Sequence, residues 1–180
     1  MSGERRKKTI GELTRVSCEG YRDIEKLPVI VLADNVRSMH NIGSMFRTAD
    51  AFLMRGLLLC GISGIPPHPD ISKTALGAER SVMWRHEESA LDAICELKKE
   101  GWKICVAEQT VGSISLEKFL PDKNERYVLV MGNEVEGVDA RIVEMADICL
   151  EIPQCGVKHS LNVSVCAGIM MWHFYSAMRL

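Results

Sequence analysis

The chain has 180 residues, of which 47% are hydrophobic and 26% charged, and its formal net charge is −2 at pH 7. These values predict one soluble globular domain with a sizeable core. They exclude a protein that binds nucleic acid through a strongly basic overall charge, so any affinity for RNA must come from a local basic face.

The first 27 residues are polar and mixed in charge, and they include the basic cluster Arg5–Lys8. The start shows no apolar core of the kind found in signal peptides. Ile10, Leu13 and Val16 have weak helical spacing, which predicts a short helical arm packed on the rest of the chain. We therefore expect a basic, helical arm over residues 1–27 and one domain over residues 28–180.

Beyond Pro28, short apolar runs alternate with helical patterns. Strands are predicted at residues 29–33, 57–61, 102–107, 127–131 and 148–152. Helices are predicted at residues 42–54, 89–100 and 139–146, and a long closing helix follows the last strand. Asp139 is expected to cap the third helix. Because the runs are apolar on both faces and alternate with helices, they predict an α/β fold with a parallel sheet and helices on both faces.

The C-terminal apolar run and the cysteines indicate where in the cell the protein is expected. The run from Leu161 to Leu180 is the only candidate membrane span, but five polar residues interrupt it, so we expect a buried helix. Seven cysteines are scattered along the chain without a Cys-x-x-Cys pair. Free thiols in a reducing cytoplasm are therefore expected rather than disulfides or zinc.

The loop after the first predicted strand, residues 34–50, carries the first group of candidate residues. Asn41 is expected to cap the following helix, and Gly43 would allow a close backbone approach. Arg47 has a rigid donor fork that suits a phosphate or a carboxylate. A cap residue followed by a surface or ion-paired arginine is the alternative, and this segment alone leaves both open.

The loop after the fourth predicted strand, residues 131–139, contains two glycines and two glutamates. Such a loop can turn tightly around a ligand, and Glu134 could orient a hydroxyl or pair with an arginine. Plain turn chemistry is the alternative. The glycines follow neither the dinucleotide fingerprint nor the Walker A pattern, which disfavours those two kinds of site.

The segment 151–164 crowds polar side chains at the mouth of an apolar helix, where they are costly to desolvate without partners. Ser160 taken alone is best explained as the helix N-cap. A serine hydrolase is disfavoured because Ser160 lacks the Gly-x-Ser-x-Gly elbow. A metal site is disfavoured because the five histidines are dispersed.

A fourth run, residues 72–85, could form a basic rim beside an aromatic side chain. Its candidates are Lys73, Arg80, Trp84 and Arg85. Solvated charge is the default interpretation of such a run.

Taken together, the three loops resemble the SpoU/TrmH family of RNA ribose 2′-O-methyltransferases, within the SPOUT superfamily. The first motif is similar to Asn35, Asn41-Ile-Gly43 and Arg47-Thr-Ala49, and the second to Met131–Gly137. The third is similar to Ile152–Gly156 followed by Ser160–Ser164. Order and spacing agree over about residues 28–175. Three residues depart from the family pattern, namely Met39, Gln154 and Lys158.

The resemblance implies a C-terminal deep trefoil knot that binds S-adenosylmethionine, and a homodimer formed through the knot helices. It implies methyl transfer to a ribose 2′-hydroxyl of RNA. The near-neutral overall charge and the short arm favour tRNA as the substrate. Ribosomal RNA, or a catalytically silent RNA-binding module of the same fold, is the alternative. The implied catalytic residues are Asn41, Arg47, Glu134, Ser160 and Asn162. The implied cofactor contacts are Ala107, Glu108, Gln109, Gly132, Ile152 and Leu161.

Overall fold

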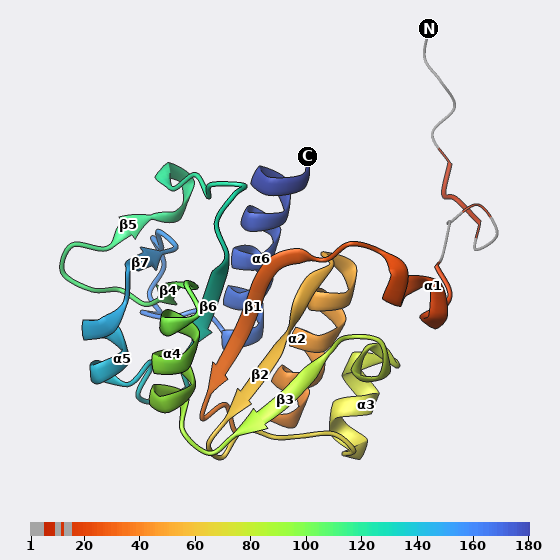
Figure 1. The fold of residues 1–180 in the computed structure, drawn as a ribbon, viewed down its shortest axis with the longest axis horizontal. Coiled ribbons are helices and arrows are strands. Elements are labelled where there is room, and N and C mark those ends of the chain that lie inside the picture. Colours follow the sequence, from red (N-terminus) through yellow and green to blue (C-terminus); the bar gives the residue numbers. More distant parts are fainter. Residues whose placement is uncertain (1–5, 10–11, 13–15) are drawn as a thin grey trace, which may run out of the picture.

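The fold is an α/β domain built on a seven-stranded sheet, and the computed structural model describes residues 6–9, 12 and 16–180 (Figure 1). The strands are β1 Leu27–Asp34, β2 Met54–Cys60, β3 Trp84–Glu87, β4 Lys103–Ala107, β5 Ile114–Ser115, β6 Tyr127–Met131 and β7 Ile148–Glu151. Their order in the sheet is β3-β2-β1-β6-β4-β7-β5, and every pairing between them is parallel. The predicted parallel sheet is therefore confirmed.

In the described part of the chain, six α-helices connect and cover the strands. They are α1 Cys18–Asp23, α2 Met39–Ala51, α3 Pro69–Ala75, α4 Ala90–Lys99, α5 Ala140–Met145 and α6 Val163–Arg179, with short 3-10 helices η2 Ala78–Arg80 and η3 Leu116–Lys118. Helices α2, α3 and α6 contribute to the core on one face of the sheet, and α4 and α5 to the core on the other. The prediction of helices on both faces is confirmed.

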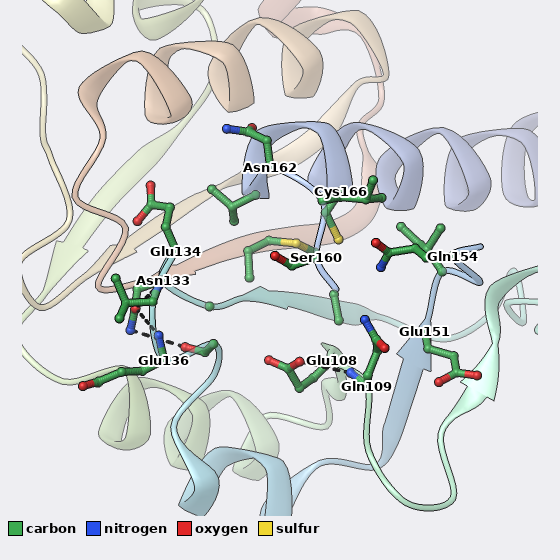
Figure 2. Close-up of a pocket in the computed structure, with 18 of the residues that line it drawn as sticks. Glu108, Gln109, Asn133, Glu134, Glu136, Glu151, Gln154, Ser160, Asn162 and Cys166 are labelled. Carbon is green, nitrogen blue, oxygen red and sulfur yellow. Dashed lines mark hydrogen bonds between the residues drawn. The ribbon is translucent and has the colours of Figure 1, made fainter. Parts of the chain in front are cut away.

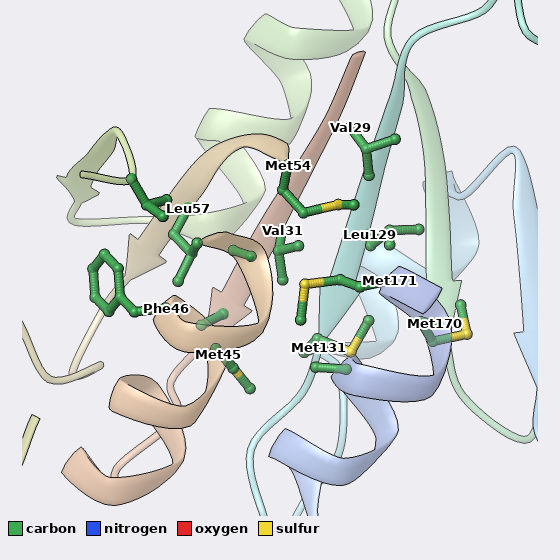
Figure 3. Close-up of a cluster of buried hydrophobic side chains, with 14 of the residues drawn as sticks. Val29, Val31, Met45, Phe46, Met54, Leu57, Leu129, Met131, Met170 and Met171 are labelled. Carbon is green, nitrogen blue, oxygen red and sulfur yellow. The ribbon is translucent and has the colours of Figure 1, made fainter. Parts of the chain in front are cut away.

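The larger core is rich in methionine. Figure 3 shows the side chains of Met45, Met54, Met131, Met170 and Met171 gathered between α2, α6 and the sheet. All five are at most 1% exposed. Because methionine is unbranched and adapts to irregular gaps, it suits the space between two helices that cross the same strands.

Two helix starts differ from expectation, and the differences matter for function. Ser38 caps α2, since its hydroxyl accepts a hydrogen bond from the Asn41 amide at 3.3 Å, so the prediction that Asn41 is the cap was wrong. Asn162 caps α6, so capping by Ser160 was also wrong. The predicted cap at Asp139 is confirmed.

Gly43 has the role expected of it. A Cβ atom there would lie 2.0 Å from Thr74 Oγ1 and 2.4 Å from the carbonyl oxygen of Ile71. Only glycine therefore lets α2 and α3 approach this closely.

The arm before the sheet is described only in part. Val16 is exposed, Ser17 caps α1, and Leu27 already belongs to β1. Ile10 and Leu13, on which the predicted helical spacing rests, lie outside the described residues. In the part of the chain that is described, no helix has both the length and the hydropathy needed to cross a membrane.

Candidate functional site

The main cavity lies where the carboxyl ends of β4, β6 and β7 meet the start of α6 (Figure 2). Its volume is about 510 Å³, within the range of small-molecule sites. Ligands of parallel α/β sheets generally bind at this edge. The lining comes from residues 107–109, 131–137, 150–154 and 160–166, so it joins the second and third loops singled out in the sequence.

The loop after β6 turns back on itself tightly. Asn133 and Gly137 exchange two backbone hydrogen bonds of 3.1 and 3.2 Å, and the Asn133 side chain accepts from the amides of Val135 and Glu136. A Cβ atom on Gly132 would lie 2.1 Å from the carbonyl carbon of Gly137. Gly132 is therefore required for the turn that forms one wall of the cavity.

Three side chains from distant segments form a hydrogen-bonded chain, which we call the amide junction: Asn162, Asn41 and Glu134. Asn162 Nδ2 donates to Asn41 Oδ1 at 3.1 Å, and Asn41 Nδ2 donates to Glu134 Oε1 at 2.8 Å. Because Ser38 caps α2, the Asn41 side chain is free to make these bonds. The junction thus holds the first, second and third motifs together beside the cavity.

Asp34 gives a second link between the first and second loops. Its carboxylate accepts from Asn35 Nδ2 at 2.8 Å and from the Asp139 amide at 3.3 Å. Burial raises the pKa of Asp34, and the hydrogen bond from the Asp139 amide partly offsets that effect. Asn35, with φ of 56°, also accepts from the Ile62 amide, so the turn after β1 is fixed by side-chain bonds.

The segment between β7 and α6 lies across the cavity, and its residues 153–162 are exposed. Ser160 lines the cavity, and its hydroxyl has no hydrogen bond within the described part of the chain. Gln109 Nε2 donates to the carbonyl oxygen of His159 at 2.8 Å, which ties the segment to the end of β4. Figure 2 shows Ser160 near Cys166 in the middle of the cavity, with Glu134 and Glu151 toward opposite ends.

The charge of the lining is acidic. Four glutamates line the cavity, and no lysine, arginine or histidine does; the glutamates are Glu108, Glu134, Glu136 and Glu151. Burial raises the pKa of the Cys166 thiol to about 11, so this side chain is neutral at physiological pH. Apolar side chains such as Leu150 and Leu161 complete the lining. The cavity therefore favours a ligand that has both positive charge and apolar surface.

Nine of the eleven predicted site residues line the cavity. All six predicted cofactor contacts line the cavity: Ala107, Glu108, Gln109, Gly132, Ile152 and Leu161. Of the five predicted catalytic residues, Glu134, Ser160 and Asn162 line it, and Asn41 joins them through the amide junction.

Arg47 is the exception. It lies on the exposed side of α2 and outside the lining of the cavity. Its helix packs beside α6, where the rings of Phe52 and Trp172 have centroids 5.5 Å apart. Arg47 is thus at the surface, on a helix that packs against α6, rather than within the cavity of its own chain.

The predicted catalytic and cofactor-binding residues leave out five polar residues of the lining, namely Asn133, Glu136, Glu151, Gln154 and Cys166. Cys166 could have been found, since it lies four residues after Asn162 and so on the same face of the closing helix. Glu151 could not, because the last residue of a strand gives no sign of which way its side chain points. Within the described residues, no group of three or more His, Cys, Asp or Glu side chains could hold a metal ion.

Comparison with known proteins agrees with these observations. Residues 28–172 match the model of the SpoU rRNA Methylase family. The chain is 33% identical over 144 residues to tRNA (guanosine(18)-2′-O)-methyltransferase of Aquifex aeolicus, covering 80% of this chain and 67% of that protein. It is 34% identical over 146 residues to 23S rRNA (guanosine(2553)-2′-O)-methyltransferase of Bacillus subtilis, covering 80% of this chain and 56% of that protein.

A solved structure agrees as well. The AdoMet-bound rRNA methyltransferase from Sinorhizobium meliloti superposes with a TM-score of 0.77 at 27% identity, covering 87% of this chain and 59% of that one. The chain thus spans between about half and two thirds of the length of these three proteins.

Proposed function

The chain belongs to the SpoU rRNA Methylase family, and on that basis we propose that it transfers a methyl group from S-adenosylmethionine to a ribose 2′-hydroxyl of RNA. The observation that carries this proposal is the amide junction, which gathers Asn41, Glu134 and Asn162 beside a cavity of suitable size. We propose tRNA as the substrate in preference to ribosomal RNA, because the near-neutral chain suits a small target. Similar proteins named for each kind of RNA keep ribosomal RNA as the alternative.

The cavity fits the cofactor that the family implies. S-adenosylmethionine has a sulfonium, an ammonium group and an adenosine, and the four glutamates and the apolar side chains of the lining match this combination. We propose that Ala107, Gln109, Gly132, Ile152 and Leu161 hold it, with Glu108 nearby. When bound, the cofactor supplies an electrophilic methyl group.

The residues of the amide junction would prepare the ribose. Asn162 and Asn41 fix the orientation of the Glu134 carboxylate through Oε1. The other oxygen, Oε2, has no hydrogen bond within the described residues, so it is the acceptor that the junction offers to the 2′-hydroxyl proton. Ser160, in the segment between β7 and α6, would also orient the ribose. Most of the rate gain would come from this orientation and from the prepared electrostatic setting.

Arg47 would bind the RNA phosphate. Its intrinsic pKa makes arginine a poor general base, so we assign it electrostatic activation of the hydroxyl rather than proton removal. A guanidinium beside the reacting oxygen lowers the cost of the negative charge that develops there. The exposed position of Arg47 on α2 leaves it accessible to RNA.

We further propose a homodimer formed through α6. Val165, Ile169 and Trp172 are 51%, 37% and 49% exposed, and they lie on the outer face of a helix whose inner face is buried in the core. An apolar stripe of this kind is typical of an interface. A dimer formed there would bring α2, the helix that carries Arg47 and packs on α6, close to the partner subunit.

The trefoil knot is also proposed from family membership. β7 lies between β4 and β5, whereas α6, which follows it, packs on α2 and β1 nearer the other end of the sheet. The segment 152–162 thus crosses several strand ends, and Gln109 holds it there. Cys60, Cys95, Cys105, Cys149, Cys155 and Cys166 are free thiols, which supports the proposal of a reducing compartment such as the cytoplasm.

Two measurements test the methyltransferase against an RNA-binding module without turnover. Calorimetry with S-adenosylmethionine measures cofactor binding, and transfer of a tritiated methyl group to unmethylated tRNA and rRNA transcripts measures turnover. We expect binding and transfer, and we expect Asn41→Ala to reduce transfer strongly. Asn124→Ala is the control, since Asn124 bonds only to Asp122 in an exposed loop. Absence of cofactor binding in the wild-type protein would favour the silent module.

A further inference from the structure

A second cavity of about 350 Å³ lies at the opposite edge of the sheet, and we call it the basic groove. Arg55 and Arg85 are the second residues of β2 and β3, and Trp102 and Arg126 immediately precede β4 and β6. Because the strands are parallel, their amino ends lie together at one end of the sheet. The acidic cavity lies at the other end, where the strands finish. At about 3.3 Å per residue, the eight residues of β1 separate the two ends by roughly 26 Å.

The groove is lined by the end of α4 and by the beginnings of β2 and β3. Leu97 of α4 and its C-cap Glu100 form one part of the lining, and Ile30 and Leu58 line it from the sheet. A Cβ atom on Gly56 would lie 2.6 Å from the carbonyl oxygen of Met83, so only glycine allows the chain to approach this closely before β3. Met83 itself is 75% exposed beside the groove.

Two guanidinium groups converge on one indole ring in the groove. The Cζ atoms of Arg55 and Arg126 lie 5.9 and 5.0 Å from the centroid of the Trp102 ring. Neither arginine has an ion pair within the described residues. Two like charges against one ring repel each other, and an anion between them would relieve the repulsion.

The carboxylates close to the groove leave this positive charge largely uncompensated. Glu87 pairs with Arg85 at 3.1 Å from Nε, and Arg85 stays 56% exposed at its side chain. Glu100 accepts a hydrogen bond from Trp102 Nε1 at 3.3 Å, and its backbone carbonyl accepts from Arg126. Three arginines therefore face one glutamate in the lining of a protein whose overall charge is negative.

We propose that the basic groove binds a nucleotide, with its phosphate between Arg55 and Arg126 and its base against the apolar wall near Met83. Arginine forks match phosphate geometry, and the groove is larger than a phosphate alone requires. The nucleotide comes either from a single strand of the RNA substrate or from a free mononucleotide. The first source rests on the proposed function, and it would make the groove a second RNA contact, remote from the methylated ribose.

The test compares three probes, namely inorganic phosphate, AMP and a uridine decamer, by calorimetry at several salt concentrations. We expect the double variant Arg55→Gln/Arg126→Gln to bind AMP or the decamer at least tenfold more weakly than the wild type. Loss of the contact with one phosphate should reduce the salt slope for the decamer by about 0.7, the value per neutralised phosphate of a single strand. Arg22→Gln/Lys118→Gln is the matched control, since it removes the same charge from exposed sites on α1 and η3.

The binding results distinguish a nucleotide of an RNA strand from a free mononucleotide. AMP binding that the double variant loses supports a free mononucleotide, and decamer binding without AMP binding supports an RNA strand. Equal affinity for phosphate and AMP, or probe binding that the double variant retains, would overturn the proposal. If the Gln variant misfolds, Arg55→Lys/Arg126→Lys takes its place. This variant keeps the positive charge but not the guanidinium fork, and it should weaken binding by less than the tenfold expected of the Gln variant. Cofactor affinity should be unchanged in all variants, so failure here is distinct from failure of the methyltransferase proposal.

Discussion

Replacing Asn162 tests whether the amide junction and the cap of α6 are separate contributions to stability. Asn162 Oδ1 accepts hydrogen bonds from the Ser164 amide at 2.9 Å and the Ser164 hydroxyl at 2.7 Å, while Nδ2 donates to Asn41. Asn162→Ala removes both functions. Asn162→Ser keeps a short acceptor at the cap position but cannot reach Asn41 in the same way.

The expected costs follow from these contacts. Loss of an N-cap costs about 1 kcal/mol. Asn41 is only 9% exposed, so leaving its Oδ1 without a donor costs roughly a further 1 kcal/mol, at the lower end for buried groups because the cavity admits water. We therefore expect Asn162→Ala to lower the free energy of unfolding by about 2 kcal/mol and Asn162→Ser by about 1 kcal/mol.

Urea unfolding followed by circular dichroism measures these changes, with an unchanged m-value as the sign that the denatured state is unaltered. In a protein of this size, about 2 kcal/mol corresponds to a loss of roughly 4–8 °C in Tm. Ser160→Ala is the control, since Ser160 is exposed and makes no side-chain bond within the described residues, and it should change stability by less than about 0.5 kcal/mol. If Asn162→Ala and Asn162→Ser were equally destabilised, the separation into two contributions would be wrong.

Three further outcomes are expected. Arg47→Ala should fold and bind S-adenosylmethionine normally but lose roughly 10²-fold in kcat/KM for methyl transfer, because it loses the contact with the RNA phosphate and the electrostatic activation of the hydroxyl; full transfer would contradict the role given to Arg47. Ile169→Glu should shift the protein from dimer to monomer in light scattering, and a wild-type monomer would refute the interface on α6. Iodoacetamide at pH 8 should label exposed Cys155 and spare Cys166, because the raised pKa of Cys166 keeps it a thiol and its alkylation should begin only as the pH approaches 11. Peptide mass spectrometry measures this labelling, and equal reaction at both sites would contradict the burial of Cys166.

The strand that the sequence predicted best is buried on both faces. The strand at Tyr127–Met131 was predicted with its observed bounds, since all five of its residues are apolar and buried. β3 and β5 lie at the two edges of the sheet, where half-polar sequences such as Trp84–Glu87 carry no apolar run. α3 was missed because its start lies among prolines, where Pro69 enters at the first helical turn and His68 caps it.

The site residues were found through motif resemblance, and the structure explains why local patterns alone misjudged them. Asn41 and Ser160 both looked like helix caps, because short polar residues before an apolar helix usually are. Ser38 and Asn162 take those roles instead, and which of several neighbouring polar residues caps a helix depends on the path of the chain. Of the four candidates for a basic rim, Trp84 and Arg85 line the basic groove, and Lys73 and Arg80 do not. Arg55 and Arg126 escaped prediction because they come from separate strand beginnings that only the sheet order brings together.

The amide junction also has a consequence for the order of events during synthesis. Its two hydrogen bonds join residues 93 and 121 positions apart, so both are among the late, non-local contacts that slow folding. β1, α2 and β2 can pair while a nascent chain is still being made, but Asn41 acquires its second partner, Asn162, only when α6 has docked. A partly made chain thus has most of its sheet and no finished site, and activity reports that the last helix is in place.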